Sequence, residues 1–212
     1  MRGVVAKTGN QEAIAAVESY VGLFNTVHDS LGNWIVHSLS YIYKNCGADS
    51  LLEAMKGVFF PTWEGMMQGY WDMNFHDRLL FCVNAVKGSH DVTIVIEDED
   101  DEKVTFRMDP CGSGERLYKK GVYDEPVNHA KCSPHPMTAG EDNFPCYCVH
   151  APIGDMAAIA ACGYPAYVQD YPEQVGTCSC LFVVYKEKEN IPEKYFARLG
   201  LTKPTKSACE AR

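Results

Sequence analysis

The sequence predicts an α+β protein in which an N-terminal helical layer packs on an antiparallel sheet, with a loop region rich in cysteine and histidine. From Gln11 to Asn45, apolar residues recur every three or four positions, the spacing of an amphipathic helix. After Gly88 the period changes to alternation, the pattern of half-buried strands. The 212 residues suffice for one sizeable core, so we expect a single domain over 1–212.

The helical part of that domain is expected over residues 11–88. Its predicted helices cover residues 11–45, 50–57, 61–70 and 74–87. The first helix should stop at Asn45-Cys46-Gly47, and a capping-box pattern that begins at Ser50 should start the second.

The sheet and the Cys/His-rich site are expected over residues 91–185. Alternating residues at 92–96 and 104–108, separated by an acidic turn, predict a hairpin. A loop-rich stretch over 110–152 should lead to a small-residue helix. That helix is expected at 153–162, the last two strands at 166–170 and 178–185, and a charged, peripheral tail at 187–212.

Charge and hydropathy limit the partners and the location that we expect. The formal net charge of -9 provides no basic face to neutralise phosphates, so nucleic acid and anionic membrane surfaces are excluded as partners. The first residues lack the apolar core of a signal peptide, and no stretch approaches the roughly 18 apolar residues of a membrane span. We therefore expect a cytoplasmic protein with a small-molecule substrate; a homo-oligomer is left open.

The cysteines point to metal or thiol chemistry. Ten cysteines without an export signal favour thiols, metal ligands or redox groups over a disulfide framework. In an extended segment, Cys146, Cys148 and His150 would share one face. Thiolate and imidazole are ligands that zinc and ferrous iron prefer, so we predict a metal there, with zinc favoured. A reactive thiol without metal and buried structural cysteines are the alternatives.

The glycine-rich loop after the hairpin is a further candidate. Cys111 is interpreted as a metal ligand or a nucleophile, and Arg116 as a bidentate clamp for a substrate carboxylate. The glycines on either side of Ser113 would expose backbone N–H groups to an anion. A plain turn, with Arg116 paired to the acidic turn at 98–101, is the alternative.

Two histidines outside this loop are candidate catalytic groups. His135 stands between two prolines, which stiffen the backbone and suit a metal ligand or a general base, although a surface histidine is the alternative. His28 lies on the apolar face of the first helix beside Asp29. A buried histidine must find a hydrogen-bond partner, so His28 is either a satisfied core residue or a group that reaches the site.

Cys178 and Cys180 would share one face of the last strand. Together with Cys146 and Cys148 they would form a four-thiolate set, which suits structural zinc or an iron-sulfur cluster. Small apolar residues packed in a strand are the alternative.

The strings 109–116, 134–136, 145–150 and 178–180 resemble the L-2-amino-thiazoline-4-carboxylate hydrolase family. The resemblance covers roughly residues 17–185 and includes a His-Asp pair that His28-Asp29 would match. It implies hydrolysis of a C–N bond in a small cyclic, sulfur-containing amidine that bears a carboxylate. Glu115 stands where another glycine is expected, which weakens the anion-binding role of the loop.

These observations together predict a metal-dependent hydrolase or lyase that acts on a small carboxylate-bearing substrate. A metal held by Cys111, Cys146, Cys148 and His150 would polarise the scissile group or activate water. Arg116 would hold the carboxylate, and the histidines would move protons. A small-molecule, metal or redox sensor and an iron-sulfur protein are the alternatives.

Overall fold

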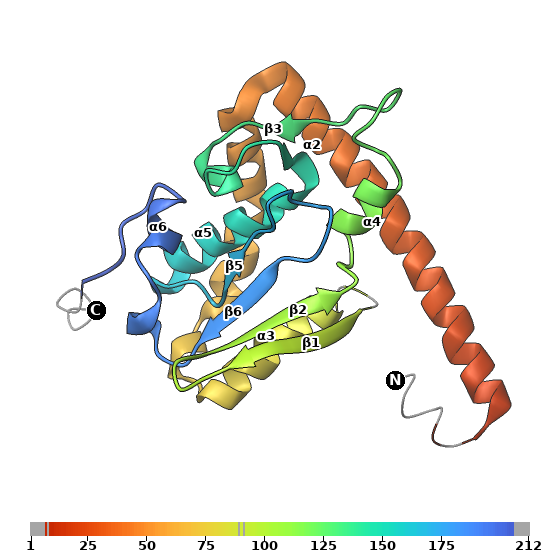
Figure 1. Cartoon of the computed structure of the whole chain (residues 1–212), viewed down its shortest axis with the longest axis horizontal. Helices are drawn as coiled ribbons and strands as arrows, with labels where there is room; N and C mark the ends of the chain where they lie inside the picture. The colour runs from red at the N-terminus through yellow and green to blue at the C-terminus, as the bar shows by residue number, and fades with distance from the viewer. Residues whose placement is uncertain (1–6, 8, 89, 91, 206–212) are drawn as a thin grey trace.

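The computed structural model of the chain describes residues 7, 9–88, 90 and 92–205, and it has the expected α+β fold (Figure 1). Its main helices are α2 (Gln11–Met67), α3 (Phe75–Gly88) and α5 (His150–Cys162). Its main strands are β1 (Thr93–Glu99), β2 (Lys103–Asp109), β5 (Val168–Asp170) and β6 (Leu181–Tyr185). The short elements are η1 (Tyr70–Asp72), α4 (Gly114–Lys119), β3 (Lys131–Cys132), η2 (Pro136–Thr138), β4 (Phe144–Pro145), η3 (Cys146–Val149), η4 (Lys188–Asn190) and α6 (Lys194–Ala197).

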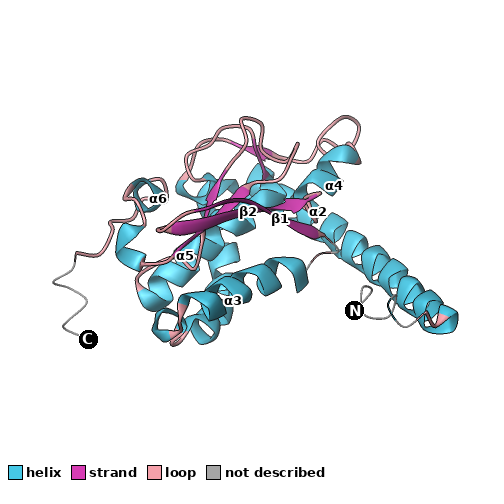
Figure 2. Ribbon diagram, turned by 60° about the horizontal axis from the view of Figure 1, so that its bottom comes forward, coloured by secondary structure: helices cyan, strands magenta, loops and turns pink. Residues whose placement is uncertain are grey.

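The four main strands form one antiparallel sheet in the order β1-β2-β6-β5, and β3 and β4 form a separate pair. The predicted hairpin is therefore confirmed as β1 and β2. Phe106 of β2 lies opposite Phe182 of β6, and their rings stack with centroids 5.2 Å apart. This face packs on α3 and α5, which lie together on one side of the sheet in Figure 2.

The opposite face of β6 is covered by the C-terminal segment, which differs from the peripheral tail expected at 187–212. Val183 and Tyr185 pack there against Ile191, Tyr195 and Phe196, all of which are buried. The apolar side chains among the charges of this segment bury enough surface to dock it on the sheet. Residues 206–212 of the predicted tail lie outside the described residues.

Helix α2 covers a stretch that was expected to contain three separate helices, at 11–45, 50–57 and 61–70. The predicted break at Gly47 is confirmed, because this residue has φ 86° and ψ 177° inside the helix. The predicted end near Gly57 and the new start at Pro61 are wrong, since the second segment runs on to Met67 with Pro61 inside it. Packing of this segment along α5 favours continuation over the local helix-breaking preference of proline. No described helix combines the length and the apolarity that a membrane crossing requires.

Two further expectations about local structure are wrong. The segment with Cys146, Cys148 and His150 is not extended but forms η3 and the start of α5. Because a 3₁₀-helix has three residues per turn, residues two apart point in different directions. The last strand begins at Leu181, so Cys178 and Cys180 precede it and do not share a strand face.

Candidate functional site

A cavity of about 260 Å³ lies between the inner face of the sheet and the helices α2, α3 and α5. Phe59 and Trp63 of α2 and Phe182 of β6 contribute apolar walls. Polar groups reach the cavity from Ser113, which follows β2, and from Gln169 of β5. A concave, mostly apolar pocket with a few convergent polar groups is the usual form of a small-molecule site.

Ser113 stands at the turn from strand β2 into helix α4 and is buried. Its Oγ lies 3.3 Å from Nε2 of His28, which comes from the N-terminal half of α2, 85 positions away. Tyr147 lies near this hydroxyl, and burial raises the pKa of its phenol. One hydroxyl therefore joins the cavity to the imidazole of His28.

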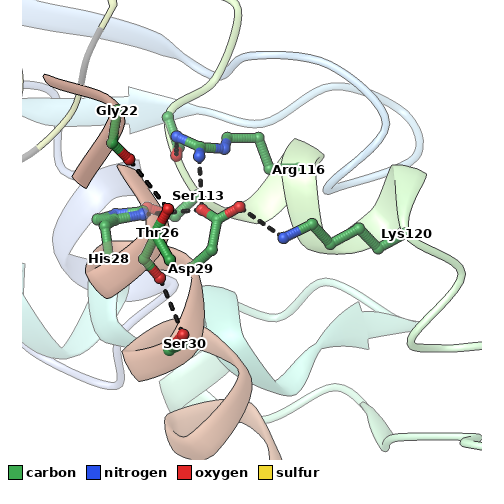
Figure 3. A network of polar contacts seen from close by, with 9 residues as sticks. Gly22, Thr26, His28, Asp29, Ser30, Ser113, Arg116 and Lys120 are labelled. Atoms are coloured by element: carbon green, nitrogen blue, oxygen red, sulfur yellow. Dashed lines mark hydrogen bonds and ion pairs between the residues drawn. The ribbon is translucent and has the colours of Figure 1, made fainter. Parts of the chain in front are cut away.

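On its other side, His28 faces a carboxylate. Nδ1 of His28 lies 3.2 Å from Oδ1 of Asp29, as Figure 3 shows. Arg116 Nη2 and Lys120 Nζ each lie 2.5 Å from an oxygen of that carboxylate. Burial raises the pKa of Asp29, but bonds from Lys120, His28 and Arg116 outweigh it and lower the pKa to about 2.

An ionised Asp29 decides which nitrogen of His28 carries the proton. A carboxylate only accepts hydrogen bonds, so Nδ1 of His28 donates to Asp29 and Nε2 is left to accept from the Ser113 hydroxyl. This is the tautomer that a histidine needs in order to act as a general base on a serine. We call Ser113, His28 and Asp29 the relay.

The two glycines beside Ser113 permit close approach. A Cβ on Gly112 would lie 2.3 Å from the Cβ of His90, and a Cβ on Gly114 would lie 2.9 Å from Sγ of Cys148. Both distances are shorter than real Cβ contacts allow. The glycines therefore let His90 and the Cys148 thiol pack against the loop that carries Ser113.

Three thiols and two imidazoles also line the cavity: Cys111, Cys148, Cys180, His90 and His150. Burial raises the pKa of Cys148 well above its usual value and that of Cys180 to about 12. Burial lowers the pKa of His90 to about 4 and also lowers that of His150. At pH 7 these two thiols and both imidazoles are therefore neutral wall groups.

The predicted metal ligands are only partly brought together. Cys111, Cys148 and His150 line the cavity, whereas Cys146 is fully buried in the core with its Sγ 3.7 Å from the carbonyl oxygen of Val36. Among the described residues, no three His, Cys, Asp or Glu side chains are grouped closely enough to hold a metal ion. The residues as placed do not fit the predicted zinc or iron site, or an iron-sulfur cluster.

The other predicted site residues lie apart from the cavity wall. Arg116 binds Asp29, in place of either a substrate carboxylate or the acidic turn at 98–101. His135 caps η2, and its Nε2 lies 3.1 Å from Oδ1 of the exposed Asp49. Of the three residues predicted to be catalytic, His28 is the one that contacts a residue lining the cavity.

Four groups of this site were not predicted from the sequence: Ser113, His90, Gln169 and Tyr171. The sequence did contain a signal for Ser113. This serine stands between two glycines directly after a predicted strand, and nucleophilic serines occur on strand-to-helix turns of this kind. Gln169 and Tyr171 belong to a short strand and its exit, and nothing in their local pattern distinguishes them from ordinary strand residues.

Comparisons with models of protein families, with curated proteins and with solved structures found no match to this chain. The resemblance to L-2-amino-thiazoline-4-carboxylate hydrolases therefore stays a prediction. The function has to be inferred from the side chains that surround the cavity, and foremost from Ser113, His28 and Asp29.

Proposed function

We propose that the protein is a hydrolase that cleaves a C–N or ester bond in a small molecule held in the cavity. The relay carries the proposal, because it joins a cavity-lining hydroxyl to an imidazole and an ionised carboxylate. The distance of 3.3 Å between Ser113 Oγ and His28 Nε2 is slightly long, as is common before a substrate tightens a catalytic hydrogen bond.

The reaction follows from the roles of these groups. Ser113 Oγ attacks the electrophilic carbon while Nε2 of His28 takes its proton, and Asp29 stabilises the resulting imidazolium. His28 then returns the proton to the leaving nitrogen or oxygen as the bond to carbon breaks. Water, activated by the same nitrogen, attacks the acyl-enzyme, releases the acid product and restores the Ser113 hydroxyl.

Two features of the loop support this assignment. Gly114 lines the cavity at the first position of α4, where a backbone N–H has no acceptor within the helix and is available to an oxyanion. Arg116 of α4 and Lys120, which directly follows it, hold Asp29, so the segment that positions Ser113 also fixes the carboxylate behind His28. The relay is thus preorganised by contacts between α4 and α2.

A small fluorophosphonate tests the proposal, because it phosphonylates serine hydroxyls that a base activates. We expect one adduct by intact mass, mapped to the peptide that contains Ser113, and none in Ser113→Ala. His28→Ala should slow labelling by about 10²-fold or more, the range for loss of a general base. Ser38→Ala removes a serine whose Oγ donates to the carbonyl oxygen of Trp34 in its own helix, and this variant should label normally.

Labelling that persists in Ser113→Ala, or that proceeds at the parent rate in His28→Ala, would contradict the relay. Circular dichroism of each variant separates a lost reaction from a lost fold. Asp29→Asn keeps the size of the side chain but removes its charge, so slowed labelling with a native spectrum would support the role of the carboxylate.

A ligand-binding or sensing protein is the second candidate function. It is favoured by the neutral thiols, because burial keeps Cys148 and Cys180 protonated and unreactive beside a preformed cavity. A protein that takes up small aromatic ligands but resists the fluorophosphonate would support this candidate over the hydrolase. The predicted zinc dependence stays a separate prediction, tested by elemental analysis of protein purified without chelators.

A further inference from the structure

The side chains that the structure describes around the cavity are uncharged. No Lys, Arg, Asp or Glu side chain lines it among the described residues. The guanidinium of Arg116, expected to clamp a carboxylate, is held by Asp29. A carboxylate placed here would lose its hydration without a countercharge.

One side of this neutral cavity has unsatisfied polar groups. Gln169 of β5 lies opposite Phe182 in the register of the sheet, so its side chain interrupts an apolar row. It is only 5% exposed, yet its Oε1 has no hydrogen-bond partner among the described residues. The hydroxyl of Tyr171, two residues on, is also buried without a partner there, and both side chains line the cavity.

Buried polar groups are nearly always hydrogen-bonded, because an unpaired one carries the full penalty of lost hydration. Two such groups, two residues apart on one wall of the cavity, indicate that a ligand completes their bonds. Oε1 of Gln169 accepts and needs a donor, whereas the hydroxyl of Tyr171 donates and needs an acceptor. An amide-type group offers both within one plane.

We propose that Gln169 and Tyr171 select a small, neutral substrate with an amide-type group, whose N–H donates to Gln169 and whose carbonyl oxygen accepts from Tyr171. The aromatic walls formed by residues such as Trp63 and Phe182 hold the apolar body of that molecule. This proposal adds a substrate class to the proposed hydrolase and depends on that function for the reaction. The binding step itself does not require Ser113.

Three probes of equal shape and different charge test the selection: benzamide, benzoate and benzamidine. Isothermal titration should show that benzamide binds and that the two charged probes bind at least about tenfold more weakly. Gln169→Leu should weaken benzamide binding at least about tenfold, because the amide loses its acceptor. The melting temperature of Gln169→Leu should stay equal or rise, because a buried unpaired amide oxygen has been removed.

Gln174→Leu is the matched control, since Gln174 is exposed and bonds the Tyr118 hydroxyl away from the cavity. It should bind benzamide like the parent. Absence of benzamide binding, tighter binding of benzoate, or a less stable Gln169→Leu variant with unchanged benzamide affinity would each overturn the selection. Ser113→Ala should still bind benzamide, so a failure of the relay and a failure of the selection are told apart.

A second, independent observation concerns the N-terminal half of α2, residues 11–46. We call this segment the arm; at about 1.5 Å per residue it is some 54 Å long, and its N-terminal end projects beyond the body of the protein, while residues from His28 onward contact the body (Figure 1). One side of the arm has large apolar side chains that are 48% to 68% exposed. This outer stripe consists of Tyr20, Leu23, Val27, Leu31, Trp34 and Tyr41.

The spacing and the charge of the outer stripe favour a helix as its partner. If Ser38 is counted, the six steps from position 20 to 41 average 3.5 residues, the repeat of a coiled-coil seam. Between positions 19 and 43 the only Asp, Glu, Lys or Arg is Asp29, which Arg116 and Lys120 bind. A membrane-surface helix would have lysines and arginines on its polar face.

We propose that two copies of the chain pair through the outer stripe, with their arms antiparallel around a two-fold axis near Leu31. At about 150–250 Å² for a large side chain, the six residues expose about 530–890 Å², comparable to the roughly 800 Å² that each partner contributes to a stable interface. Antiparallel pairing sets Val27 opposite Trp34 and Tyr20 opposite Tyr41, so that the large Trp34 meets a small residue and not its own copy.

Sedimentation equilibrium of the full chain over a wide range of concentrations tests the pairing. The parent should be a dimer and Trp34→Glu a monomer, because a carboxylate would be buried in the seam. Asn33→Glu puts the same charge on the neighbouring, exposed position outside the stripe and should leave the dimer intact. A monomeric parent, or a dimer that Trp34→Glu leaves unchanged while circular dichroism stays native, would overturn the pairing.

Discussion

Replacing Asp155 by Asn should change how the stability of the protein depends on pH. Asp155 lies on α5 with a side chain only 6% exposed, and its Oδ2 is 3.6 Å from Nη2 of Arg198. That separation is too long for a hydrogen bond, and neither atom has another partner among the described residues. Burial therefore raises the pKa of Asp155 to about 7, although the guanidinium opposes the rise.

The sign of the effect follows from this raised pKa. The folded state holds the proton of Asp155 more tightly than the unfolded chain, where an aspartate has a pKa of about 3.9. The resulting stability is present in full below pH 4 and is lost as the pH rises through 7. A shift of about three pKa units corresponds to about 4 kcal/mol, of which about 2.5 kcal/mol falls between pH 5 and pH 8.

Urea unfolding of the parent and of Asp155→Asn at pH 5 and pH 8 measures this loss. The asparagine does not ionise, so other titrating groups cancel when the two proteins are compared at each pH. The parent should lose about 2–3 kcal/mol relative to the variant between pH 5 and pH 8. Asp142→Asn, which changes an exposed aspartate, should follow the parent.

The opposite slope would refute the reasoning. If Arg198 keeps Asp155 ionised in the folded protein, its folded pKa lies below the unfolded value and the parent gains stability relative to the variant as the pH rises. Parallel curves for the two proteins would show that the pKa of Asp155 is the same in the folded and unfolded states.

Three further substitutions have expected outcomes. Phe106→Ala removes the ring that stacks on Phe182 and should lower the free energy of unfolding by about 3–5 kcal/mol in urea, with a far smaller loss for Phe106→Leu. Gly114→Ala places a Cβ against Cys148 and should destabilise the fold by about 1–3 kcal/mol; Cys148→Ala in the same chain should restore part of the loss, and no restoration would place the strain elsewhere. Asn10→Ala removes the cap of α2 and should reduce stability by about 1 kcal/mol in thermal unfolding, whereas Asn10→Ser should retain most of it.

Local patterns in the sequence determined much of the secondary structure. The helical period predicted the first segment of α2, and alternation predicted β1 and β2, because each pattern reports which side chains of one segment share a buried face. The helix expected at 74–87 is found as α3, one residue later at each end. The glycine at 47 predicted the kink of α2 for an equally local reason, its access to positive φ. Two of the expectations that were wrong, at Pro61 and in the C-terminal segment, concern places where packing overrides local preference.

The site depended on tertiary structure. Composition and motifs directed attention to the region from Cys111 to Cys180 and to His28; Cys111, Cys148, His150 and Cys180 of this region line one cavity, and His28 lies beside it. Local pattern could not show that Cys146 enters the core while Cys148 reaches the cavity, since a single 3₁₀ turn decides between them.

The relay and the polar end of the cavity were likewise decided only by the fold. Ser113 meets His28 across 85 positions because α4 docks on α2, and Gln169 reaches the cavity because β5 pairs with β6 in one register. Side-chain contacts between distant segments depend on how whole faces bury apolar surface against each other. A sequence records the residues that those faces contain, and their packing decides which of the polar side chains come within reach of one another.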